Sequence, residues 1–109
     1  MTMAFRKQEN DRLYQICRAL ANPVRIQIVR FVRANPGCHG SDILGQLPAD
    51  VARAQSTLSQ HLKVLCDARV LEAQANGAAV KYWLNVDAFD WLREQLDELQ
   101  HEPTLTHLA

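Results

Sequence analysis

The amino-acid sequence predicts a mainly α-helical fold that carries one small β-hairpin. Apolar residues recur at intervals of three and four through most of the chain, which is the spacing of an amphipathic helix. Residues 80–84 alternate in pattern and follow an Asn-Gly pair, which is a signal for a hairpin. With 109 residues, the chain is expected to form one domain, flexible at residues 1–8 and 102–109.

The first two helices are predicted on either side of Asn22-Pro23. An apolar stripe with helical spacing predicts a first helix from about Glu9 to Ala21; its residues are Leu13, Ile16, Cys17 and Leu20. Asparagine is a good N-cap, and proline is tolerated at the first helical position. A second helix is therefore expected from Pro23 to about Ala34, where Asn35-Pro36-Gly37 ends it.

Two further helices are predicted in the middle of the chain. Cys38-His39-Gly40 is expected to be a connector, and Ser41 is a plausible N-cap for a short helix through Leu47. Pro48-Ala49-Asp50 should break that helix. A fourth helix is expected from about Arg53 to Ala68.

The hairpin and a last helix complete the predicted fold. The strands are expected at about 70–75 and 80–84, with Asn76-Gly77 at the turn. Asn85 can cap a helix that runs to about His101. A short helix, a turn, a second helix and a hairpin form a winged helix-turn-helix, here in the order ααα-α-ββ-α.

The fourth helix has an unusual polar face. Its apolar stripe contains Ala54, Leu58, Leu62 and Leu65. The opposite face has hydroxyl, amide and lysine side chains, flanked by Gln55 and Thr57, with no carboxylate before Asp67; it contains Ser56, Ser59, Gln60 and Lys63. This composition costs helix propensity, but it suits contacts with phosphates and base edges. The alternative is a polar surface helix of no special role.

Composition excludes several classes of protein. The N-terminus has no apolar run like that of a signal peptide, and no stretch approaches the roughly 20 apolar residues of a membrane span. Three cysteines without a CxxC pair favour a reducing cytoplasm. No phosphate-binding loop, catalytic triad or HExxH motif is present, so no enzyme is expected.

The formal net charge is zero, but the charge is unevenly distributed along the chain. Residues 1–35 are mostly basic and residues 86–102 mostly acidic. The basic segment could face phosphates, or the two segments could be solvated helix faces of opposite sign.

Two stretches resemble the ArsR/SmtB-type bacterial repressors. Residues 54–65, Ala-Gln-Ser-Thr-Leu-Ser-Gln-His-Leu-Lys-Val-Leu, are similar to the family's recognition helix, and Ala19-Leu-Ala-Asn-Pro-Val-Arg-Ile26 to its turn into the second helix. Asn76-Gly77 and Val80–Asn85 stand where the family has its wing. The resemblance implies a homodimer that binds a pseudo-palindromic operator and represses transcription until an inducer releases it.

The resemblance also implies the residues of both contact surfaces. Those expected at double-stranded operator DNA are Gln55, Ser56, Thr57, Ser59, Gln60, His61, Lys63 and, from the wing, Lys81. A hydrogen-bonded structural role for His61 is an open alternative. The dimer would form through the first and last helices, whose apolar positions are Leu13, Ile16, Phe89, Leu92, Leu96 and Leu99.

Three features depart from the family's pattern. The segment from Leu47 to Arg53 is longer than the usual turn, so the recognition helix is expected to be tilted or extended. Ala68-Arg69 stands where the family often has a helix-ending glycine. The wing tip, Gly77-Ala78-Ala79, lacks arginine, which predicts a weaker wing contact.

The sequence leaves the inducer open, and no cofactor is expected. Where metal-sensing members carry two cysteines, this chain has Cys38 alone, and Phe89 replaces a histidine of another family metal site after Asp87. The remaining candidate for sensing a metal, a metalloid or an oxidant is a thiol site at Cys38, with His39, Cys17 or Cys66 as possible further ligands. The alternative is that Cys17 and Cys66 are small core residues. An organic effector and a regulator without any effector are the other possibilities for the input, and a winged-helix module that binds protein instead of DNA is the alternative function.

Overall fold

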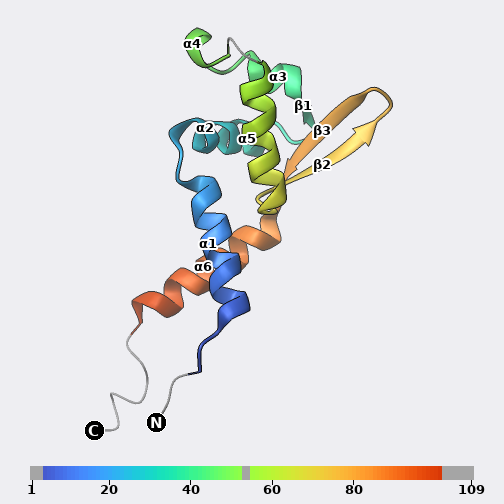
Figure 1. The fold of residues 1–109 in the computed structure, drawn as a ribbon. Coiled ribbons are helices and arrows are strands. Elements are labelled where there is room, and N and C mark those ends of the chain that lie inside the picture. Colours follow the sequence, from blue (N-terminus) through green and yellow to red (C-terminus); the bar gives the residue numbers. More distant parts are fainter. Residues whose placement is uncertain (1–3, 53–54, 102–109) are drawn as a thin grey trace, which may run out of the picture.

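The computed structural model describes residues 4–52 and 55–101 of the chain. The helices are α1 (Lys7–Leu20), α2 (Pro23–Ala34), α3 (Gly40–Leu44), α4 (Ala49–Ala52), α5 (Gln55–Asp67) and α6 (Val86–Gln100). The strands are β1 (Cys38–His39), β2 (Leu71–Asn76) and β3 (Ala79–Leu84). The predicted mainly helical fold with a small hairpin is confirmed, and Figure 1 shows the arrangement.

The predicted N-caps of α2 and α6 are confirmed. The Asn22 side chain accepts hydrogen bonds from the backbone N–H groups of Val24, at 2.9 Å, and Arg25, at 3.2 Å. The Asn85 side chain accepts one from Ala88 at 3.4 Å. These contacts satisfy donors of the first helical turn that have no partner within the helix. Helix α1 begins at Lys7, so the segment predicted to be flexible extends too far; residues 1–3 and 102–109 lie outside the described chain.

The core lies where α1, α2, α3, α5 and the sheet meet. Its buried side chains are apolar, and they include Ile16, Ile28, Val32, Ile43, Leu65, Val70 and Leu71, each no more than 2% exposed. Burial of this apolar surface is the main favourable term in folding. The apolar stripe of α5 therefore packs into this core and holds the helix against the rest of the domain.

The sheet has one strand more than the sequence predicted. The strand order is β1-β3-β2, and both pairings are antiparallel. Cys38 pairs with Tyr82 and His39 with Lys81, so the expectation that residues 38–40 are only a connector was wrong. A strand of two residues is too short to show an alternating pattern, which is why sequence alone missed it. At the hairpin turn, Gly77 has a φ of +65°, as the Asn-Gly signal predicts.

The segment before α5 also differs from the prediction. His39, not Ser41, precedes the short helix α3, and its backbone N–H donates to the Asp42 carboxylate at 2.9 Å. Residues 49–52, expected to be only a break, form the short helix α4. This extra turn accounts for the greater length of the segment between Leu47 and α5.

Helix α5 ends in a left-handed cap without a glycine. Arg69 has a φ of 61°, and the N–H of Val70 donates to the Leu65 carbonyl at 2.9 Å while that of Arg69 donates to Cys66 at 3.0 Å. These two hydrogen bonds define the Schellman motif, in which the left-handed residue is usually glycine. The chain thus keeps the cap at the cost of a strained arginine.

Replacing Arg69 with glycine should therefore stabilise the domain. A left-handed side chain costs roughly 1–2 kcal/mol, and the added freedom of an unfolded glycine offsets part of that, so we expect a gain of about 0.5–1 kcal/mol. Urea denaturation would measure it. Arg69→Ala is the matched control, because it removes the side chain but keeps the strain; equal stability of the two variants would contradict the explanation.

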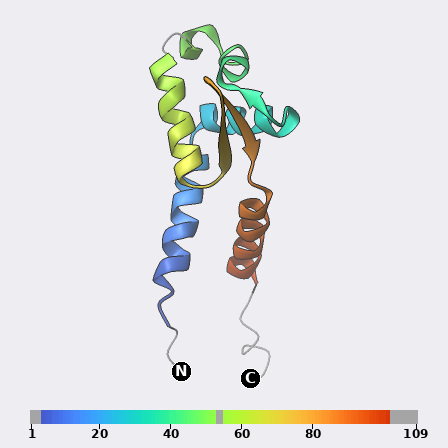
Figure 2. The ribbon, with the colours of Figure 1, turned by 90° about the vertical axis from the view of Figure 1, so that its right-hand side faces the viewer.

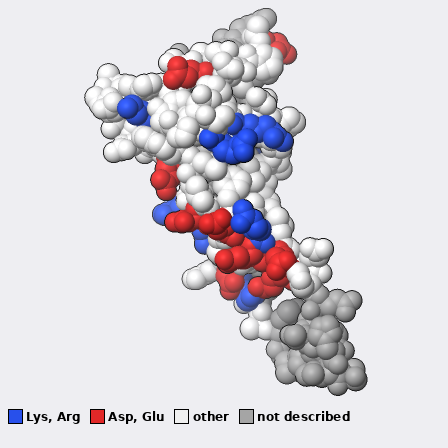
Figure 3. Space-filling model, turned by 180° about the vertical axis from the view of Figure 1, so that it is seen from behind, with Lys and Arg blue, Asp and Glu red and all other residues white. Residues whose placement is uncertain are grey.

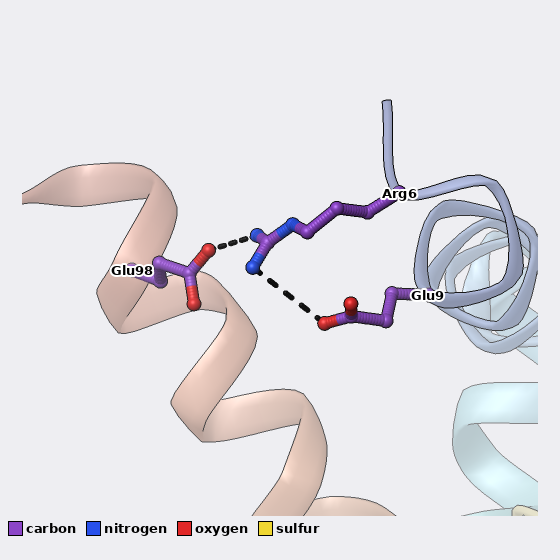
Figure 4. Close-up of polar contacts among 3 residues, drawn as sticks. All are labelled: Arg6, Glu9 and Glu98. Atoms are coloured by element: carbon purple, nitrogen blue, oxygen red, sulfur yellow. Dashed lines mark hydrogen bonds and ion pairs between the residues drawn. The ribbon is translucent and has the colours of Figure 1, made fainter. Parts of the chain in front are cut away.

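Helices α1 and α6 extend together away from the sheet. The two helices contact each other, crossing in the view of Figure 1 and running alongside each other in Figure 2, with the start of α1 and the end of α6 at the same end of the molecule. The Arg6 guanidinium contacts the carboxylates of Glu9 and Glu98 and so joins the two helices there (Figure 4). The Arg12 guanidinium lies 4.1 Å from the centroid of the Trp91 ring, a cation–π contact between the same helices. None of the helices in the described residues is long and apolar enough to cross a membrane.

Candidate nucleic-acid interface

Helix α5 presents the two faces that its sequence predicts. Leu58, Leu62 and Leu65 are between 0% and 6% exposed and pack into the core. On the outer face the exposed residues are Ser56, Ser59, Gln60 and Lys63. Gln55 begins the helix, while Arg53 and Ala54, which the prediction included, lie outside the described residues.

The outer face of α5 carries little negative charge. Asp67 is the one carboxylate on this face among the described residues. Its Oδ2 atom accepts a hydrogen bond from Nζ of Lys63, one helical turn away, at 3.0 Å. Both side chains are exposed, so the pair is worth little and Lys63 can exchange Asp67 for another anion. Short hydroxyls, one amide and one lysine on a rigid helix can approach a polyanion closely.

Thr57 and His61 lie on the flank of α5 and not on its outer face. Both are half-buried. The His61 Nδ1 atom lies 3.3 Å from Nη1 of Arg25, a residue of α2. Burial, and secondarily the Arg25 charge, lower the pKa of His61 below its ordinary value. This contact supports the structural role for His61 that the sequence left open.

The wing is a plain hairpin. Lys81 is half-buried on the central strand β3, between His39 of β1 and Gln74 of β2, and so lies back from the turn. The turn itself, at Gly77 and Ala78, is exposed and bears no charge. The tip of the wing therefore has no charged side chain that could contact a phosphate.

The predicted dimer residues divide into two groups. Ile16 is 2% exposed in the protomer's own core, and Leu13, Phe89 and Leu92 are half-buried. Leu96 and Leu99 are 51% and 71% exposed on α6. Sequence reasoning missed two further exposed apolar residues at this end of the molecule, Phe5 and Tyr14. Tyr14 directly follows Leu13, the first residue of the predicted α1 stripe, and its large aromatic side chain was the available signal.

The basic and acidic segments that the sequence separates contact each other within the protomer. The basic N-terminal segment and the acidic α6 are neighbours, joined by Arg6 and Glu98. Acidic and basic side chains intermingle over the narrow end that α1 and α6 form (Figure 3). Most of the described charged side chains of both segments are nevertheless exposed, which agrees with the alternative of solvated faces, and Arg6 is paired with Glu9 and Glu98.

The cysteines do not form a recognisable sensor. Cys38 is 8% exposed, and burial, with the nearby Asp42 carboxylate, raises the pKa of its thiol. A buried thiol with a raised pKa is a poor nucleophile. Cys66 is half-buried as expected, whereas Cys17 is exposed, so its assignment to the core was wrong. Within residues 4–52 and 55–101, no group of three or more His, Cys, Asp or Glu side chains could hold a metal ion.

The elements together define a winged helix-turn-helix domain, with α5 in the place of the recognition helix and β2–β3 as the wing. The chain is 29% identical over 85 residues to the arsenical resistance operon repressor of Staphylococcus xylosus, covering 78% of this chain and 77% of the repressor. No established family model matches the chain.

Solved structures share the fold. An ArsR-like transcriptional regulator from Rhodococcus sp. RHA1 superposes with a TM-score of 0.73 at 16% identity, over 84% of this chain and 82% of that one. The homodimeric winged helix-turn-helix DNA-binding domain of a possible ArsR-family regulator from Mycobacterium bovis gives 0.63 at 21%, over 95% and 94%. The predicted resemblance to ArsR/SmtB-type repressors is thereby confirmed.

Proposed function

We propose that this protein is a sequence-specific DNA-binding transcriptional regulator, a homodimeric repressor that an inducer releases from its operator. The observation that carries the proposal is the outer face of α5, where Ser56, Ser59, Gln60 and Lys63 are exposed on a helix fixed by three buried leucines. Hydroxyl and amide groups recognise base edges and phosphates, and lysine supplies charge. Its regulator relatives support the same function. A protein of this kind acts in the cytoplasm and is not an enzyme.

The proposed recognition depends more on α5 than on the wing. The wing tip is uncharged, and Lys81 lies back from the tip on β3. We therefore assign specificity to Gln60 together with Gln55, Ser56 and Ser59, and assign Lys63 to the phosphate backbone. Lys81 and Thr57 are secondary contacts in this proposal.

Alanine substitutions on α5 should separate these roles. Lys63→Ala should weaken binding to all DNA sequences, because it removes a charge that contacts a phosphate. The slope of log affinity against log salt concentration should become shallower by about one. Gln60→Ala should relax specificity by about 1–3 kcal/mol at one base pair, because it removes a bidentate contact. Fluorescence anisotropy on an operator selected from random DNA would measure both. Wild-type binding by both variants would show that α5 is not the contact helix.

We propose that the dimer forms through α1 and α6, where Phe5, Tyr14, Leu96 and Leu99 expose apolar surface. Large apolar side chains that a protomer leaves exposed in this number are typical of a surface that an assembly covers. Sedimentation equilibrium at micromolar concentration should give a dimer, and Leu99→Glu should shift it to monomer. Lys81→Glu, on the wing, is the control and should leave the dimer intact; a monomeric wild type would remove the argument for two half-sites.

The inducer is the open part of the proposal. The burial and raised pKa of the Cys38 thiol argue against oxidant sensing there, and no group of three or more metal ligands surrounds it within the described residues. Release of bound operator DNA by zinc, arsenite, peroxide or polysulfide, each tested in turn in a gel shift, would decide the question. Release that survives Cys38→Ser would place the sensor elsewhere, and failure of all four agents would favour an organic effector or a regulator without any effector.

A further inference from the structure

Arg25 contacts two other helices from the first turn of α2. Its Nε atom donates to the Ala19 carbonyl at 2.7 Å, and Nη2 donates to the Arg18 carbonyl at 3.2 Å. Both carbonyls belong to the last turn of α1, where helix carbonyls lack their usual partner four residues on; the Arg18 carbonyl also accepts from the Ala21 N–H at 3.2 Å. Its third nitrogen, Nη1, lies 3.3 Å from Nδ1 of His61, in the middle of α5. One guanidinium thus joins the end of α1 to α5.

The chemistry of this contact fixes the state of His61. A guanidinium can only donate hydrogen bonds, so Nδ1 of His61 must accept. His61 is therefore neutral and carries its proton on Nε2. The lowered pKa of His61 agrees with this state. Since the His61 side chain is half-buried on the flank of α5, the contact holds the helix from its side.

Apolar packing alone would hold α5 less precisely. The helix rests on Leu58, Leu62 and Leu65, and apolar packing is non-directional and tolerates small rotations. A hydrogen bond to a planar guanidinium weakens steeply when its angle changes. The Arg25–His61 contact can therefore hold the rotation of α5 about its own axis, which the leucines alone would not.

We propose that Arg25 is a positioning residue for the DNA-binding helix: through His61 it sets the rotation of α5 relative to α1. The proposal rests on the proposed function, because the rotation of α5 matters for activity only when its outer face contacts DNA. Helix α1 also carries part of the proposed dimer surface. The Arg25–His61 contact would then couple the orientation of each DNA-binding helix to the dimer.

The first experiment observes His61 without DNA. Two-dimensional proton–nitrogen NMR of the imidazole nitrogens reports the tautomer, and His61→Gln identifies the His61 signals by their loss. The wild type should show the Nε2–H tautomer. Arg25→Lys keeps the charge but places it on a single nitrogen, which cannot reproduce the contacts that the three separate guanidinium nitrogens make, so it should give a mixture of tautomers. Arg33→Lys is the matched control, since Arg33 is an exposed residue of α2 with no described contact to α5, and it should leave His61 unchanged.

The second experiment measures the affinity of the same full-length proteins for a DNA fragment from the promoter beside their own gene. Arg25→Lys and His61→Leu should each lose about tenfold, the scale of one hydrogen bond, while His61→Gln should bind within about twofold because its amide oxygen can accept from Arg25. A phosphate-contacting Arg25 would instead be rescued by lysine. Sedimentation confirms that each variant keeps the wild-type assembly.

Several outcomes would overturn the proposal. One is a wild-type His61 protonated on Nδ1, and another is a His61 spectrum that Arg25→Lys does not alter. If Arg25→Lys changed the tautomer of His61 but not the affinity for DNA, the Arg25–His61 contact would exist without positioning α5 for DNA binding. If the wild type binds no DNA although His61 shows the expected tautomer, the proposed function fails, and the positioning role fails with it.

Discussion

Replacing Leu65 with alanine is expected to destabilise the domain by about 2–5 kcal/mol, the usual cost of emptying a well-packed core position. Leu65 is 0% exposed and lies at the C-terminal end of the apolar stripe of α5, in the core shared with α1, α2 and the sheet. Its carbonyl also accepts the hydrogen bond that closes the helix cap, from Val70 at 2.9 Å. The substitution should thus loosen both the packing and the end of α5. Urea denaturation followed by circular dichroism would measure the loss.

Ser59→Ala is the matched control, because Ser59 is exposed on the opposite face of the same helix. It should change stability by less than about 0.5 kcal/mol. If both variants were equally stable, Leu65 would not be in the core, and the assignment of the two faces of α5 would be wrong.

Replacing Gln60 with glutamate should reduce DNA affinity by roughly 100-fold or more, because like charges brought together at an interface cost several kcal/mol. The two side chains have nearly the same shape, so the variant adds a charge and little else. Gln60 is exposed in the middle of the outer face, so the charge should not disturb the fold. Fluorescence anisotropy with operator DNA and with unrelated DNA should show the loss for both.

Gln100→Glu provides the same change in charge at the end of α6, far from α5 (Figure 1). It should bind DNA nearly as the wild type does. A similar loss in the two variants would mean that net charge, and not the position of the charge on α5, governs binding.

Most of the fold could be predicted because its signals are local. Asn22-Pro23 starts α2 and Asn76-Gly77 turns the hairpin through contacts between residues a few positions apart, and the leucines of α5 reveal its buried face by their spacing. The elements that the sequence did not predict lack such local signals. Strand β1 exists only because Cys38 and His39 pair with β3, and α4 follows a proline that sequence alone treats as a break.

The candidate site divides in the same way. The exposed hydroxyl, amide and lysine face of α5 follows from helical periodicity and was predicted. The Arg25–His61 contact joins residues 36 positions apart, and the pairing of Arg6 with Glu98 joins residues 92 apart, so no local pattern contains either. The exposure of Cys17, at a position that the stripe of α1 would bury, depends on which neighbours pack there, and periodicity does not supply that.

The most direct test of the central claim is the salt dependence of DNA binding by the wild-type protein. Affinity for a fragment of the promoter beside its own gene should be measured by fluorescence anisotropy between about 50 and 200 mM salt, with a scrambled fragment in parallel. If α5 contacts DNA, affinity should fall steeply as salt rises, and the promoter fragment should bind more tightly than the scrambled one throughout. Absence of binding at low salt, or equal binding of both fragments, would contradict the account.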